Sequence, residues 1–225
     1  MITWGERQTA GSGMSEPFDT KEYWEGRHAE LCGDLRNVGN RGLTPEQNAR
    51  LVTAKAVRVA NLLGTLGYGP GTQALDAGCG AGACTRMLAD GGFVMAGIDV
   101  SPTAIEDGNR DGHATYRCGT LHEFIWGDSF QVVLCLDVLF HVVDDQAWRD
   151  SLANLAGHVL PGGHLIIIEF FARYGQPTSP HVRWRSQPMY EERTRELGLQ
   201  LEQVETFAYP EEGETKTLMV LRRPG

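Results

Sequence analysis

A glycine-rich turn between two short apolar segments constrains the fold of this 225-residue chain more than any other feature. The turn lies within Ala74–Gly82, and a second apolar segment, Gly97–Val100, follows after a short helical run. The pattern predicts a strand, a tight turn that lets the backbone approach a ligand, a helix start, and a second strand ending in a diol-binding carboxylate. The spacing is Gly-x-Gly-x-Gly, whereas dinucleotide-binding proteins have Gly-x-Gly-x-x-Gly, which packs a pyrophosphate against the helix.

Downstream of about Leu51, segments of strand length alternate with segments of helical periodicity. This alternation predicts a parallel sheet covered by helices on both faces. The last connecting helix, with Trp148 and Val159 on its apolar face, is expected to stop at Leu160–Gly163. Five alternating strands are expected, at Thr72–Asp76, Phe93–Asp99, Ala114–Cys118, Phe130–Asp137 and Gly163–Phe170.

The C-terminal part departs from this alternation. A short helix is expected around Pro188–Leu197, followed by two strands, Leu199–Tyr209 and Lys216–Arg222. The turn-rich link Pro210–Glu214 is short enough for a hairpin, so the last strand should enter the sheet antiparallel.

The N-terminal part divides into two regions. Residues 1–17 are rich in Gly, Ser and Thr and show no periodicity, so we expect a disordered tail. Residues 18–50 are expected to form a helical lid with a first helix over Lys21–His28, ahead of the main domain at 51–225. Thr44, Pro45 and Gln47 form a helix-start signal with a capping box.

Composition limits the possible partners. Lys and Arg number 20 against 29 Asp and Glu, a net charge of −9 without a basic block, so a nucleic-acid partner is not expected. No apolar run has the length of a membrane span, and the first residues are too polar for a signal peptide. The five cysteines are odd in number and lack paired metal spacing, so we expect reduced thiols in a cytoplasmic protein and no metal site.

The glycine turn, Asp99, the five strand–helix units and the terminal hairpin together resemble the class I S-adenosylmethionine-dependent methyltransferases. The resemblance extends from about Leu51 to the C-terminus. It implies a Rossmann-like, mostly parallel seven-stranded α/β sheet with an antiparallel C-terminal strand, and S-adenosylmethionine as cofactor with S-adenosylhomocysteine as product. The oligomeric state is not indicated.

The resemblance also implies cofactor-binding roles for individual residues. Asp76 would interact with the cationic amino group of the methionine end, and Asp99 would accept both ribose hydroxyls. Thr120 stands where relatives often have an acid that binds the adenine amino group. The remaining cofactor positions implied are Gly78, Gly80 and Gly82 in the turn, together with Val100, Leu121 and the backbone of Leu136.

These assignments have structural alternatives. The glycines would then only turn the chain, and Asp99 would cap the following helix. Leu121 and Phe124 either enclose the adenine ring or pack in the core.

His141, after the fourth strand, is the candidate catalytic residue. Its pKa suits a general base for an acceptor that must lose a proton. The alternative is a structural histidine, with Asp144 capping the next helix. Candidate substrate-binding residues are Tyr23, Trp24, Arg27, Phe140, His181 and Arg183, unless the tryptophan is an anchor and the arginines are solvated.

The sequence therefore predicts a methyltransferase acting on oxygen or nitrogen of a small molecule, such as a secondary metabolite in natural product biosynthesis. One alternative is methylation of a peptide or protein terminus. Another, of a different class, is a cyclase-like or regulatory protein that binds S-adenosylmethionine without transferring its methyl group. The acceptor itself is not indicated by the sequence.

Overall fold

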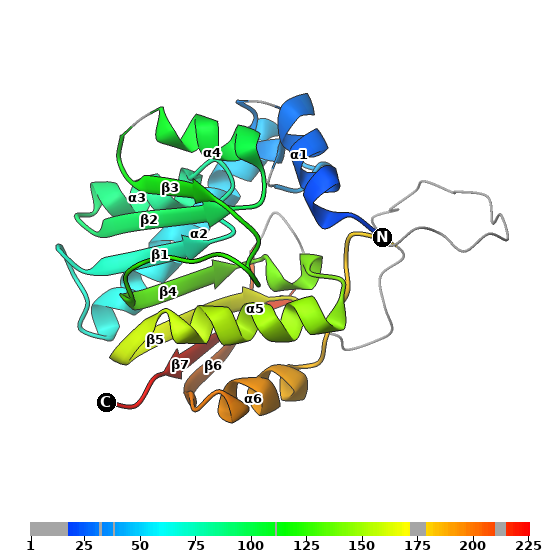
Figure 1. The fold of residues 1–225 in the computed structure, drawn as a ribbon. Helices are drawn as coiled ribbons and strands as arrows, with labels where there is room; N and C mark the ends of the chain where they lie inside the picture. The colour runs from blue at the N-terminus through cyan, green and yellow to red at the C-terminus, as the bar shows by residue number, and fades with distance from the viewer. Residues whose placement is uncertain (1–17, 32, 38, 111, 172–178, 210–214) are drawn as a thin grey trace, which may run out of the picture.

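Seven strands form one sheet with the order β3-β2-β1-β4-β5-β7-β6 (Figure 1). All neighbouring strands are parallel except β7, which pairs antiparallel with both β5 and β6. This confirms the predicted α/β fold with an antiparallel last strand. The strands are β1 Gln73–Ala77, β2 Val94–Asp99, β3 Thr115–Cys118, β4 Phe130–Leu136, β5 Val159–Glu169, β6 Gln200–Ala208 and β7 Thr215–Arg222.

The structure is a computed structural model that describes residues 18–31, 33–37, 39–110, 112–171, 179–209 and 215–225. The predicted disordered tail, Cys32 and the hairpin link Pro210–Glu214 lie outside the described residues.

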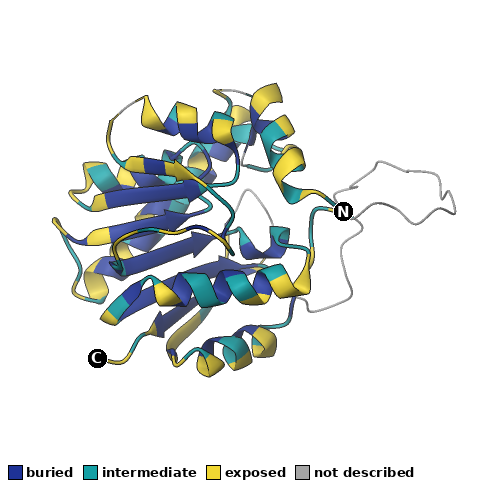
Figure 2. Ribbon diagram, in the orientation of Figure 1, coloured by how far each residue is buried: buried dark blue, intermediate teal, exposed yellow. Residues whose placement is uncertain are grey.

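Helices cover both faces of the sheet. Helices α5 and α6 pack on one face, in a core that includes Trp148, Leu152 and Tyr190, whereas α2 and α3 pack on the other with Leu63 and Leu88. The central strands β1, β4, β5 and β7 are mostly buried between these layers, whereas the edge strands β3 and β6 are largely exposed (Figure 2). The helices are α1 Thr20–Glu30, α2 Pro45–Thr65, α3 Ala83–Asp90, α4 Pro102–Asn109, α5 Asp145–Gly157 and α6 Gln187–Glu196, with the short turns η1 Leu35–Asn37 and η2 Leu139–His141.

The strand order places a ligand site at one edge of the sheet. The chain runs outward from β1 through β2 to β3, then returns to place β4 on the other side of β1. Ligands of open α/β sheets bind at such a switch point, beyond the carboxyl ends of the strands. The glycine turn after β1 lies at this edge.

Local helix signals are confirmed at several starts. The hydroxyl of Thr44 accepts the Gln47 N–H at 3.2 Å, and the Gln47 side chain accepts the Thr44 N–H at 2.8 Å, which completes the capping box. Ser101 caps α4 and Asp144 caps α5 in the same way. These starts depend only on residues close in sequence.

The predicted end of the helix before β5 is wrong. Helix α5 ends at Gly157, and β5 already begins at Val159, so Leu160–Gly163 belong to the strand. Gly162 has a φ of 82°, and a Cβ on Gly163 would lie 2.5 Å from the carbonyl oxygen of Gln131. The two glycines therefore shape an irregular strand start against β4, where the pairing register shifts.

Replacing Gly163 with Ala should lower the free energy of unfolding by about 1–3 kcal/mol, because the added methyl group collides with β4 backbone. Chemical denaturation measures this. Gly157→Ala is the control, since nothing lies within 4 Å of its Cβ position, and it should change stability by less than about 1 kcal/mol. Equal stability of the two variants would contradict the close approach.

Candidate functional site

The glycine turn is required by the protein's own packing. Gly78, Gly80 and Gly82 all have positive φ values, of 84°, 55° and 78°. A Cβ on Gly78 would lie 2.4 Å from the Val138 side chain, and one on Gly82 would lie 2.2 Å from the hydroxyl of Tyr116. The turn therefore fixes the position of the segment after β4 as well as the start of α3.

Asp99 joins the end of β2 to the glycine turn. One carboxylate oxygen accepts the Gly80 N–H at 2.9 Å, and the other accepts the Ser101 N–H at 3.0 Å. Burial raises the pKa of Asp99. The cap of α4 is Ser101, whose hydroxyl accepts the Ala104 N–H, so the alternative that Asp99 caps this helix is wrong.

Asp76 is a buried carboxyl group at the end of β1. It accepts a hydrogen bond from the Thr85 hydroxyl at 2.7 Å, and burial raises its pKa to about 6. A cationic group bound beside it would stabilise the ionised form. The positively charged amino group of an amino acid would pair favourably with the Asp76 carboxylate.

The segment after β3 gives a mixed result for the predicted adenine contacts. The Thr120 hydroxyl donates to Glu123 at 3.1 Å, so a carboxylate that the sequence prediction missed lies one hydrogen bond from this position. Leu121 and Phe124 are buried in the α5-side core, and Asn154 donates to both of their carbonyl oxygens. Phe124 also stacks on His158, which favours the core alternative for this pair.

The other two predicted cofactor positions lie at the same edge of the sheet. Val100 is half-buried between β2 and α4. Leu136 is the last residue of β4 and is buried.

A buried group of charges holds the turn after β4, and the sequence prediction did not include it. Asp137 has a φ of 64°, and its carboxylate pairs with Lys55 of α2 at 2.5 Å and Lys216 of β7 at 3.0 Å. Burial alone would raise the pKa of Asp137, but Lys216 and Lys55 together lower it to about 2. The ion pairs therefore keep this carboxylate ionised.

Glu169, at the end of β5, binds the backbone of the same turn. It is fully buried and accepts the N–H groups of Leu139 at 2.7 Å and of Phe140 at 3.2 Å. Burial raises the pKa of Glu169 well above its ordinary value. The turn that presents Phe140 and His141 is thus anchored by Glu169 as well as Asp137.

Aromatic rings from three separate segments meet around His141. Trp24 of α1 contacts His141 edge-on at 4.7 Å between ring centroids, and Phe140 lies 4.1 Å from it. His181 stacks on His141 at 5.6 Å and on Tyr23 at 4.5 Å. Four predicted substrate residues are therefore brought together with the predicted catalytic one.

The hydrogen bond of His141 defines its tautomer. Its Nδ1 lies 2.9 Å from the carbonyl oxygen of His181, which can only accept, so Nδ1 bears the proton and Nε2 has the lone pair. Burial lowers the pKa of His141 to about 3. The ring is therefore neutral at physiological pH, and Nε2 is a hydrogen-bond acceptor.

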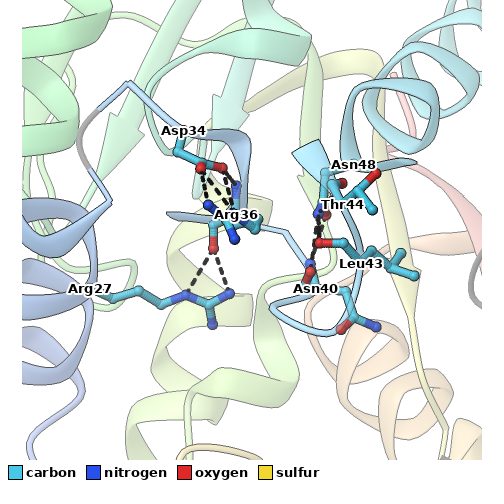
Figure 3. A network of polar contacts seen from close by, with 7 residues as sticks. All are labelled: Arg27, Asp34, Arg36, Asn40, Leu43, Thr44 and Asn48. Atoms are coloured by element: carbon cyan, nitrogen blue, oxygen red, sulfur yellow. Dashed lines mark hydrogen bonds and ion pairs between the residues drawn. The ribbon is translucent and has the colours of Figure 1, made fainter. Parts of the chain in front are cut away.

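Arg27, a predicted substrate-binding residue, makes structural hydrogen bonds. Its guanidinium is buried and donates to the carbonyl oxygens of Arg36, at 2.8 and 3.2 Å, and of Gly39. Figure 3 shows this contact beside a second network, in which the Asn48 amide donates to the carbonyl groups of Asn40, Leu43 and Thr44. Together they fix the connection between α1 and α2.

The Arg183 guanidinium also points away from the ring cluster. It pairs with Asp145 at the start of α5 at 2.7 Å, and the buried Arg185 pairs with the same carboxylate at 2.9 Å. The backbone N–H of Arg183 donates to the Phe140 carbonyl at 2.8 Å. The Arg183 side chain, a predicted substrate-binding group, therefore makes an ion pair with α5 in this structure.

Comparisons with known proteins agree with this geometry. Residues 74–163 match the family model of a methyltransferase domain, a range that includes the glycine turn, Asp99 and His141. Nodulation protein S of Rhizobium tropici is 33% identical over 109 residues, which cover 47% of this chain and 46% of that protein. The matched segment therefore has the sequence of a methyltransferase domain. The chain spans about half the length of the curated relatives it matches.

Solved methyltransferase structures share the whole fold at low sequence identity. Magnesium protoporphyrin IX methyltransferase from Synechocystis PCC 6803, with bound SAH, has a TM-score of 0.70 at 18% identity and covers 90% of this chain and 97% of its own. N-methyltransferase NodS from Bradyrhizobium japonicum WM9 has a TM-score of 0.67 at 21% identity, covering 92% and 100%. Within the described ranges, no helix has the length and apolar character to cross a membrane.

The buried carboxyl group of Asp76, just before the glycine turn, should make the stability of the protein depend on pH. The folded pKa of Asp76, about 6, exceeds its ordinary value of 3.8, so the folded state holds a proton that the unfolded state releases. Stability is therefore lost as pH rises from about 4 to 6. Asp76→Asn removes this titration and should be more stable than the unmodified protein by about 1–3 kcal/mol at pH 8, with little difference at pH 4.

Thermal unfolding without cofactor at the two pH values measures the effect. Asp90→Asn is the control, because Asp90 is exposed at the end of α3. An Asp76→Asn protein less stable than the unmodified one at pH 8 would contradict a destabilising carboxylate.

Proposed function

We propose that this protein transfers the methyl group of S-adenosylmethionine to an oxygen or nitrogen atom of a small molecule. The observation that supports this most directly is that the predicted cofactor residues and the predicted catalytic residue lie at the same edge of the sheet. Asp76, the glycine turn and Asp99 lie at the ends of β1 and β2, and Phe140 and His141 follow the adjacent strand β4.

The cofactor-side residues fit the chemistry of S-adenosylmethionine. When bound, this cofactor supplies an electrophilic methyl group on a sulfonium. The buried Asp76 would hold the amino group of the methionine end, because a cation there offsets the cost of burying an ionised carboxylate. Asp99 would accept the ribose hydroxyls, for which each carboxylate oxygen has a second lone pair besides the one used by a backbone N–H.

The acceptor side is aromatic. Tyr23, Trp24, Phe140 and His181 surround His141, and such rings favour a flat molecule that stacks against them. The guanidinium groups of Arg27 and Arg183 already pair with other protein groups, so this proposal does not assign them to an anionic acceptor. A planar acceptor without a required negative charge fits these residues best.

In this proposal most of the rate enhancement comes from alignment. The rings and the fixed turn after β4 would orient the acceptor in line with the sulfonium, in a site that excludes water. The Nε2 lone pair of His141 would accept a hydrogen bond from the O–H or N–H of the acceptor and so direct the nucleophilic atom. Its low pKa makes it a better orienting group than a full proton acceptor.

The small-molecule assignment draws support from the acceptor named for the Synechocystis neighbour, a magnesium protoporphyrin. A screen of metabolites and peptides with methyl-labelled cofactor, read by mass shift, tests the proposal. Labelled product together with S-adenosylhomocysteine supports it. Product formed only from peptides would favour the peptide alternative, and an unchanged sulfonium in the presence of a converted substrate would favour a protein that does not transfer methyl.

Replacing Asp99 with Ala should weaken binding of S-adenosylhomocysteine at least tenfold, because the ribose loses a charged hydrogen-bond acceptor. Isothermal titration calorimetry measures the dissociation constant. Asp90→Ala is the matched control, at an exposed carboxylate away from the turn. Unchanged affinity in Asp99→Ala would disprove the ribose assignment.

Replacing His141 with Gln should lower kcat about 10- to 100-fold at saturating acceptor, through the loss of a directed hydrogen bond. Because the pKa of His141 is about 3, the rate of the unmodified enzyme should show no inflection from this residue between pH 5 and 8. The pH–rate profile measures both effects. An inflection near pH 6.5 that disappears in His141→Gln would instead identify a conventional general base.

A further inference from the structure

His28 is a buried histidine for which the proposed function has not yet accounted. It lies on the lid helix α1 and is 1% exposed. Its Nδ1 has no hydrogen-bond partner among the described residues. An unpaired buried polar atom costs about 1–3 kcal/mol, so buried polar atoms are usually paired with protein, water or ligand.

Hydrogen bonds to Glu25 dock helix α1 against the start of α4, close to the carboxylate of Asp99. The Glu25 carboxylate accepts the Ser101 hydroxyl at 2.5 Å and the Thr103 hydroxyl at 2.6 Å, at the start of α4. Ser101 in turn donates its backbone N–H to Asp99. His28 follows Glu25 by three residues and therefore lies on the same helix face, next to Asp99.

The groups around His28 agree with this placement. Among the charged groups near His28, Asp99 has the largest influence on its pKa, followed by Arg27, Glu25 and Asp107. Burial outweighs the three carboxylates and lowers the pKa of His28, so the ring is neutral. The Trp24 ring, one helical turn before His28 on α1, lies 6.4 Å from it between centroids.

We propose that Nδ1 of His28 donates a hydrogen bond to a ribose hydroxyl oxygen of the nucleoside that Asp99 binds. This inference rests on the proposed function. The two residues are complementary, because a carboxylate takes the protons of a vicinal diol, and the hydroxyl oxygens then have lone pairs for an N–H donor. The lid helix, which Glu25 and Trp24 already hold in place, would thus recognise the cofactor directly.

The test compares ligands that differ by one hydroxyl group. S-adenosylhomocysteine and its 2′-deoxy and 3′-deoxy analogues are titrated calorimetrically into the full chain and into His28→Leu, His28→Asn and His113→Leu. Asn can place an amide N–H near the position of Nδ1, and His113 is an exposed histidine used as the control. Circular dichroism establishes that each variant is folded.

We expect His28→Leu to bind S-adenosylhomocysteine roughly five- to tenfold more weakly, the effect of one buried hydrogen bond. For one of the two deoxy analogues, the one that lacks the hydroxyl bound by His28, His28→Leu and the unmodified protein should have the same affinity. His28→Asn should recover most of the affinity, and His113→Leu should match the unmodified protein.

Equal weakening of all three ligands in His28→Leu would overturn the proposal, because it would indicate a packing role only. Unchanged affinity for all three would overturn it as well. Failure of the unmodified protein to bind S-adenosylhomocysteine would instead refute the proposed function.

If His28→Leu does not fold, the ¹⁵N shift of His28 Nδ1 in the unmodified protein provides the test. It should change with S-adenosylhomocysteine but not with one deoxy analogue, and an identical response to all three ligands would overturn the proposal.

Discussion

The pairing of Asp137 with two lysines is the interaction on which the shape of the site depends. It joins the end of β4 to α2 through Lys55 and to β7 through Lys216, so it links three elements far apart in sequence. It also stabilises a left-handed backbone conformation that is uncommon outside glycine. Removing either lysine would leave buried charge less compensated, which typically costs 3–5 kcal/mol when a buried pair is broken.

The fixed turn after β4 decides where the proposed chemistry can occur. Glu169 holds its backbone from β5, and Gly78 allows Val138 to pack against the glycine turn, so the cofactor and acceptor sides share one rigid junction. Helix α1 contacts both parts of this region, through Glu25 at the start of α4 and through Trp24 at His141. A substitution that moves α1 should therefore alter both the start of α4 and the surroundings of His141.

Sequence patterns predicted the features that depend on neighbouring residues. The capping box at Thr44, the strands and the glycine turn follow from local backbone preference and from periodicity, and the structure confirms them. The predicted helix end at Gly162 and Gly163 is wrong, because these glycines lie in the first part of β5. The reason is a contact with Gln131, about 30 residues earlier in the chain, which no local pattern records.

The sequence alone determined the fold class, the position of the glycine turn and the two carboxylates beside it, because these depend on short-range geometry. It also placed aromatic residues in the segments that meet at His141. Only the tertiary structure decided the partners of the charged side chains: Arg27 and Arg183 turned to protein groups, whereas Lys55 and Lys216 converged on Asp137. A charged side chain pairs with whatever group the fold brings near it, and residue type gives no information about that distance.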